Sequence, residues 1–330
     1  MSSGGQMNDA GVTSLSVVRA RGLLALAIAA LGVAMFHFWG NTYAGLDTRE
    51  ATRSCFVWLG RRWRDSAASF GGGDYSHAWL IPLITGWLIW RQRSALRAAP
   101  VDPSLAGLAV TAFGLFLHWA GARAQQPQAS AVAMVVLCWG IPFYVRGWPT
   151  ARLLLFPCAY LLFCIPWNFF DSATFPLRLL ASMVSAGLLN GIGIPSIRSG
   201  TAIYSADGGG FNFDVADPCS GIRSLLAMMA LTALYAYFRP GSILKRWVLF
   251  VGSLPLAMAG NIARIVAVAV VARMFGPEAA QGAYHDYSGY IFYTVAVLLM
   301  VGLGRLLEVD LRGWAHRHRE RHLRRKGAAP

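Results

Sequence analysis

The feature that most constrains this chain is a series of about eight apolar runs, each long enough to cross a membrane as a helix. The runs cover residues 22–40, 76–92, 105–122, 129–146, 152–168, 219–238, 246–275 and 288–307. A soluble fold with one core cannot bury so many of them, and a composition of 56% hydrophobic and 13% charged residues agrees. We therefore expect an all-α polytopic membrane protein, with a bundle of about eight transmembrane helices over residues 22–307.

The net charge of +14 comes largely from short basic clusters beside the apolar runs, such as "RQRSALR" and the terminal "RGWAHRHRERHLRRK". Lysine and arginine in short flanks mark the cytoplasmic side of a membrane protein, so we interpret the charge as topology and expect no nucleic-acid partner. Residues 1–21 and 308–330 are then cytoplasmic tails. The loop at 41–74 fits less simply, because its five arginines lie on the predicted outside, although nearby acidic residues nearly balance them.

A segment of about fifty residues, 169–218, is left on the outer side by this topology. Its first half is expected to form either a helix that lies in the membrane interface or a ninth, partial span. Its second half alternates apolar and polar residues around Asp207–Gly210, which predicts a small β-hairpin with a glycine-rich turn. The expected fold therefore includes a small extracytoplasmic hairpin that leads directly to a cysteine.

That cysteine, Cys219, lies at a predicted helix start. Asp217 suits the N-cap and Pro218 the first helical position, so the thiol falls in the first turn, where the helix dipole favours a thiolate. Arg223 lies one turn deeper on the same face. The pattern predicts a reactive thiol with a cation nearby.

Two further residues are expected at the same outer level. Arg264 follows Arg246 by 18 residues, or about 27 Å of helix, and an arginine inside a span usually faces a cavity or a function. His285 lies in the outer loop just before the last span. A thiol nucleophile, a cation for an oxyanion and an imidazole for proton transfer are the groups that acyl transfer needs.

These motifs resemble those of the exosortase and archaeosortase family. "PCSGIR" looks like the family's cysteine signature, "NIAR" like its Asn-x-x-Arg motif and "YHDYSG" like its histidine region, in the family's order. "DYSHAWLIPLITGWLIWRQR" is similar to its early Tyr-Ser-His-Gly motif, with Ala78 in place of the glycine, and "LLLFPCAYLLFCIPW" resembles its fifth helix. The resemblance covers most of residues 70–305.

The resemblance implies a membrane-embedded cysteine transpeptidase-like enzyme, often linked to exopolysaccharide production. Such enzymes recognise a C-terminal tail on exported proteins, made of a short motif such as Pro-Glu-Pro, a transmembrane helix and a basic cluster, and cut near the motif at the outer face. Cys219 would form a thioester, Arg264 would stabilise the oxyanion and His285 would act as general acid or base. The matching motifs also supply five expected supporting residues: Ser220, Gly221, Arg223, Asn261 and His77. Asp217, the expected N-cap, is a sixth, although other residues are common at its position in the family.

Other chemistries have weaker support. The sequence lacks the His-Glu-x-x-His pair of a metalloprotease, the Gly-x-Ser-x-Gly elbow and the Walker loop, and we expect no metal or cofactor. A multi-pass transporter or flippase for polysaccharide or lipid-linked substrates would also use intramembrane arginines, and a non-catalytic assembly factor is a third reading. Neither gives a reason for the thiol of Cys219. Whether Arg223 or Arg264 faces the oxyanion, and whether Cys55 has a role, stay open.

Overall fold

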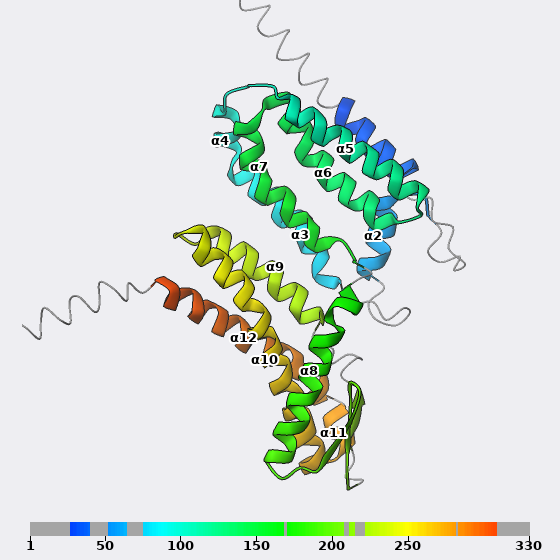
Figure 1. The fold of residues 1–330 in the computed structure, drawn as a ribbon, viewed down its shortest axis with the longest axis vertical. Helices are drawn as coiled ribbons and strands as arrows, with labels where there is room; N and C mark the ends of the chain where they lie inside the picture. Colours follow the sequence, from blue (N-terminus) through cyan, green and yellow to red (C-terminus); the bar gives the residue numbers. More distant parts are fainter. Residues whose placement is uncertain are drawn as a thin grey trace, which may run out of the picture. The chain divides into compact units, whose positions relative to one another are not determined.

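The structure of the chain is a computed structural model that describes residues 27–39, 52–64, 75–167, 170–207, 211–214, 222–281 and 283–308 (Figure 1). The chain divides into two compact units. Of the described residues, the first unit contains 27–39, 52–64 and 75–167, and the second contains 170–207, 211–214, 222–281 and 283–308.

All regular elements in the described part of the first unit are helices. Its helices are Ala27–Phe38, α2 (Cys55–Arg64), η1 (Ser76–Trp79), α3 (Leu80–Arg91), α4 (Arg93–Ala98), α5 (Leu105–Arg123), α6 (Pro127–Arg146), α7 (Trp148–Tyr160) and η2 (Leu161–Cys164). Apolar side chains of the first helix, α2, α6 and the residue after η2 form one buried cluster that includes Phe36, Trp58, Leu137 and Ile165. The apolar runs therefore pack against one another along narrow seams.

Helices α5 and α6 pack closely because glycines line their seam. A methyl group added at Gly107 would stand 2.2 Å from the backbone nitrogen of Tyr144, and one added at Gly114 would stand 2.9 Å from the side chain of Leu137. Small residues at such positions let two helix backbones approach, which is how helices associate within a bilayer. The seam between α5 and α6 is thus specified by residues without side chains.

The second unit is built around one long helix. Its elements are α8 (Phe170–Gly191), β1 (Ser196–Ser199), β2 (Ala202–Ser205), β3 (Asn212–Asp214), α9 (Ile222–Phe238), α10 (Ile243–Phe275), α11 (Pro277–Gln281) and α12 (Ala283–Glu308). The 33 residues of α10 extend for about 50 Å, so this helix is longer than the apolar core of a membrane. Its first half packs with α9 and α12 in a buried cluster that includes Met228, Leu249 and Met300.

The second half of α10 supports a small antiparallel sheet in the order β1-β2-β3. Ile203 and Phe211 from one face of this sheet are buried with Leu189 of α8 and with Ile265 and Val268 of α10. The opposite face carries Ile197 and Tyr204, which are exposed. The sheet is therefore attached to α8 and α10 through one apolar face.

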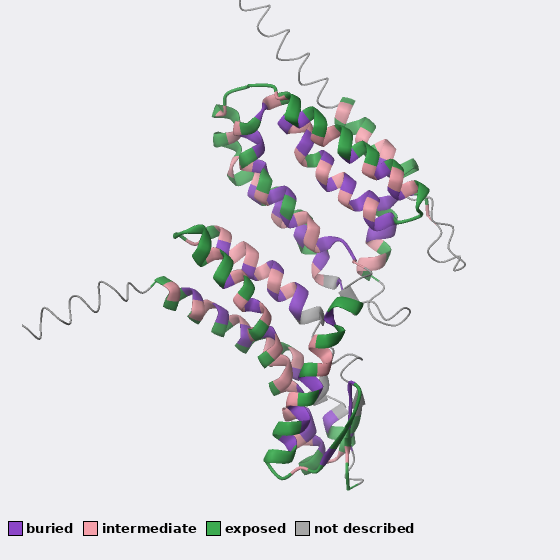
Figure 2. Ribbon diagram, in the orientation of Figure 1, coloured by how far each residue is buried: buried purple, intermediate pink, exposed green. Residues whose placement is uncertain are grey.

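Many large apolar side chains lie on the outer surfaces of the helices, where exposed and intermediate residues predominate in Figure 2. Five helices in the described residues are long and apolar enough to cross a membrane: Leu105–Arg123, Pro127–Arg146, Ser172–Gly191, Ile243–Phe275 and Tyr287–Glu308. A water-soluble protein would not expose this much apolar surface, whereas lipid would cover it. The predicted polytopic all-α membrane fold is confirmed.

The details differ from the sequence-based predictions in three places. The segment after residue 169 forms a full helix, α8, whose residues Ser172–Gly191 are themselves long and apolar enough to span. The predicted hairpin is present as β2 and β3, but it gains a third strand, β1, that was not predicted. Helix α2 also lies where only a loop was expected. The eight-span count and the cytoplasmic tails stay predictions.

Candidate active site

Arg264 lies in the middle of the candidate site, on the second half of α10. Its Nε donates a hydrogen bond of 3.1 Å to the Oγ of Ser288, on the first third of α12. Ser288 is fully buried. The polar contact therefore lies between two packed helices, where a hydrogen bond to a charged group contributes more than at a wet surface.

Gly289 gives the guanidinium its second contact. A methyl group added at this glycine would stand 3.5 Å from Cζ of Arg264 and 3.6 to 3.7 Å from its two terminal nitrogens. These are ordinary van der Waals distances, so the guanidinium lies directly over the glycine. An alanine would just fit, whereas a larger side chain would compete with the guanidinium for space.

His285 belongs to the same helix as Ser288 and Gly289. Position 285 is helical, and its side chain lies outside the described residues. Helical positions three and four apart share a face, so position 285 lies on the face of α12 that Arg264 contacts, about 5 to 6 Å along the axis. The backbone arrangement is therefore compatible with the predicted meeting of Arg264 and His285.

The predicted nucleophile, Cys219, lies outside the described residues, as do Asp217, Ser220 and Gly221. The elements on either side of it are described. Strand β3 ends at Asp214, five residues before Cys219, and α9 begins at Ile222, three residues after it. Arg223 is helical, and its side chain is also outside the description. The roles of these residues stay predictions.

Two predicted supporting residues have described surroundings. Asn261 lies one turn before Arg264 on α10 and is partly buried. His77 lies in η1 of the first unit, where its ring stacks on Tyr75 with centroids 6.0 Å apart. The hydroxyl of Tyr75 accepts a hydrogen bond of 3.2 Å from the backbone nitrogen of Trp167. His77 thus has a defined place within the first unit.

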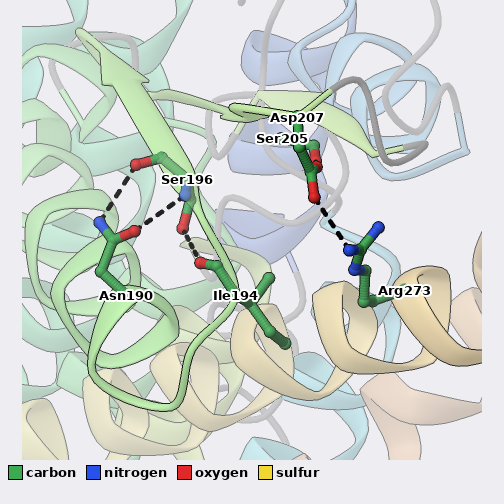
Figure 3. A network of polar contacts seen from close by, with 6 residues as sticks. All are labelled: Asn190, Ile194, Ser196, Ser205, Asp207 and Arg273. Atoms are coloured by element: carbon green, nitrogen blue, oxygen red, sulfur yellow. Dashed lines mark hydrogen bonds and ion pairs between the residues drawn. The ribbon is translucent and has the colours of Figure 1, made fainter.

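The sheet is attached to α8 and α10 by polar contacts as well as apolar ones (Figure 3). Arg273 of α10 pairs with Asp207, at the end of β2, at 2.9 Å. Asn190 of α8 bonds to both backbone groups of Ser196 in β1. The ion pair ties the β2–β3 hairpin to α10, the helix that carries Arg264, and the bonds of Asn190 tie β1 to α8.

A second polar feature lies in the first unit and does not resemble a catalytic site. A cavity of about 500 Å³ is lined by His37, Arg53 and Ser54 among others, and Nδ1 of His37 lies 3.1 Å from Oγ of Ser54. The same hydroxyl accepts a hydrogen bond from the Val57 nitrogen, so Ser54 acts as a cap for α2. In the described residues, no group of three His, Cys, Asp or Glu side chains could hold a metal ion.

Sequence reasoning did not single out Ser288 and Gly289 as functional residues. Both belong to the "YHDYSG" stretch, three and four positions after His285. That spacing was the available signal, because it puts them on the face of the histidine once the segment is known to be helical. Their contact with Arg264 depends on how α10 and α12 pack.

Comparison with known proteins agrees with these motifs. The sequence profile of the transmembrane exosortase family matches residues 63–302, which is more than two thirds of the chain. Neither a curated protein nor a solved structure gave a match. The profile includes all three motif segments, those of Cys219, Arg264 and His285. The chain therefore belongs to the transmembrane exosortase family.

Proposed function

We propose that this exosortase is a cysteine peptidase or transpeptidase that cuts exported proteins at a C-terminal sorting tail. The tail would comprise a short motif, a transmembrane helix and a basic cluster. The observation that carries the proposal is the Arg264 guanidinium held by buried Ser288 on the His285 face of α12. A partly buried, oriented cation beside a histidine position suits a reaction that develops negative charge on oxygen.

The proposed reaction has two acyl-transfer steps. The thiolate of Cys219 attacks the scissile carbonyl, and Arg264 stabilises the negative charge on the tetrahedral oxygen. The C–N bond then breaks, His285 gives a proton to the leaving amine, and a thioester remains on Cys219. Water or an amine, deprotonated by His285, attacks the thioester and restores the thiol.

The orientation of the second unit supports cleavage at the outer face. One end of the unit contains the ion pair between Arg239 and Glu308 and, at the start of α10, Lys245 and Arg246. The opposite end contains Arg264, the sheet and α11. Basic residues in short flanks favour the cytoplasm, so the Arg264 end faces outward to the space that exported proteins reach. The membrane would be the cytoplasmic one.

The test is co-expression with an exported reporter protein that carries such a tail. The Cys219→Ala variant should leave uncut precursor in the membrane, while Cys158→Ala, which changes a buried cysteine of α7, should cut normally. Mass spectrometry should find the reporter joined to Cys219 when the second step is slow. Normal processing by Cys219→Ala would exclude the thioester route and favour a transporter or flippase, which has no need of the thiol.

A further inference from the structure

The two outer edges of the sheet expose different backbone groups. The nitrogen of Ser205 donates to the oxygen of Phe211 at 3.0 Å, and the nitrogen of Ala206 donates to the oxygen of Pro195 at 2.9 Å. In an antiparallel ladder, bonded and non-bonded pairs alternate. With the observed register, Ser196 and Arg198 therefore direct their N–H and C=O groups away from the sheet on the β1 side, and Asn212 and Asp214 do so on the β3 side.

A side chain closes the β1 edge at Ser196. Asn190 of α8 donates from Nδ2 to the oxygen of Ser196 at 3.1 Å, and its Oδ1 accepts from the nitrogen of Ser196 at 2.8 Å (Figure 3). The side-chain amide has the same donor and acceptor as a peptide unit, so it occupies the place of a further strand. An additional strand cannot pair there without displacing it.

The β3 edge differs, because within the described residues Asn212 and Asp214 have no hydrogen-bond partner on their outward side. Natural sheets usually protect such edges, and peptide-binding proteins use them to add a strand from a ligand. In the sequence, the β3 edge is also close to the predicted nucleophile, Cys219. Cys219 follows Asp214 by five residues, a reach of at most about 17 Å of extended chain.

The edge is fixed relative to Arg264. Phe211 immediately precedes β3 and is buried with Ile203 against Ile265, the neighbour of Arg264 on α10. The ion pair of Asp207 with Arg273 ties the turn of the same hairpin to α10, nine residues after Arg264. A peptide paired with β3 would thus lie on a sheet that belongs to one packed body with Arg264.

We propose that β3 binds the substrate as a fourth strand, through the outward backbone groups of Asn212 and Asp214. The ligand is an extended peptide segment of an exported protein next to its scissile bond. Backbone pairing holds a peptide straight and fixes its register by two residues at a time, while accepting many side chains. The inference rests on the proposed function, because it supplies the substrate segment for the same cysteine.

The test removes one outward N–H from each edge. Asn212→Pro deletes an N–H that points away from β2, so the ladder within the sheet stays intact, and edge strands tolerate proline. Loss of this bond should raise KM for the tailed reporter about tenfold in a purified assay. Arg198→Pro is the control, because it removes the equivalent N–H on the β1 edge, together with the bond of the Arg198 guanidinium to the oxygen of Gly200. It should keep cleavage within about twofold of the wild type.

A second measurement covers the case in which Asn212→Pro destabilises the protein. A photo-crosslinking amino acid at position 212 should attach to the reporter within a few residues of its cleavage site, and one at position 198 should not. Unchanged KM in a folded Asn212→Pro, or equal crosslinking from both edges, would overturn the strand pairing. That outcome would not contradict the proposed function, provided that the wild type cuts the reporter and Cys219→Ala does not.

Discussion

At the scale of single residues, the hydroxyl of Ser288 helps to orient the Arg264 guanidinium. The bond from Nε to Ser288 fixes the plane of the group, and Gly289 leaves space for it to lie against α12. An arginine without such a contact could adopt many rotamers and would lose more conformational entropy on stabilising a transition state. Ser288 is therefore a positioning residue in the proposed mechanism.

Ser288→Ala should lower kcat for reporter cleavage about tenfold and leave KM nearly unchanged, since the lost bond holds a charged group that acts in the transition state. Ser288→Thr keeps the hydroxyl and should recover most of the activity. The control is Ser253→Ala, which removes an equally buried serine whose hydroxyl bonds to Phe250 of its own helix. Equal losses in Ser288→Ala and Ser253→Ala would indicate a general packing effect.

The thiol of Cys55 should be inert in the folded protein. Burial, together with the neighbouring Cys164 thiol, raises the pKa of Cys55 from 9.0 to about 12. At pH 8 the thiolate fraction, and with it the alkylation rate, falls about a thousandfold. Single-cysteine variants that retain only Cys55 or only Cys219 can be compared for iodoacetamide labelling at this pH. Fast labelling of Cys55 would contradict its burial between α2 and the neighbouring helices.

At the scale of elements, the sequence predicts the long helices well because their apolar runs are continuous over the depth of a bilayer. It fails where tertiary contacts decide. Strand β1 has only four residues, and its ladder depends on β2 and on Asn190 of α8. Helix α2 is short, and its buried residues Trp58 and Leu59 find partners on other helices. The same limit applies to the candidate site, where the sequence predicts Arg264 as a site residue but not its hydrogen bond with Ser288.

Glycine-to-alanine substitutions inside and outside the seam of α5 and α6 should change stability in opposite directions. Gly107→Ala should destabilise the protein by about 1 to 3 kcal/mol, because its methyl group would overlap the backbone of Tyr144. Gly86→Ala in α3 meets nothing within 4 Å and should stabilise the helix by up to about 1 kcal/mol. Thermal unfolding of the purified proteins in detergent measures both. A gain of stability in Gly107→Ala would contradict the close approach of these helices.

At the scale of the whole molecule, the proposed function requires one orientation of the second unit. The basic residues at the start of α10 and the Arg264 site in its second half must lie on opposite sides of the membrane's midplane. The helix is long enough, because its 33 residues extend for about 50 Å against a core of about 30 Å. If α8 crosses the membrane, the number of crossings before α9 changes by one. The positions of the two ends of α10 can be measured directly, without that number.

Two exposed residues of similar accessibility mark these ends, Leu244 at 69% and Met274 at 68%. In a background with Cys219→Ala, a cysteine at position 274 should react with a membrane-impermeant maleimide on cells whose outer barrier is permeable to it. A cysteine at position 244 should react only after the cytoplasmic membrane is opened, because the basic flank keeps it inside. The reverse pattern would place Arg264 and β3 toward the cytoplasm. An exported substrate could not then present its cleavage motif to Cys219 after crossing the membrane, and the proposed cleavage at the outer face would fail.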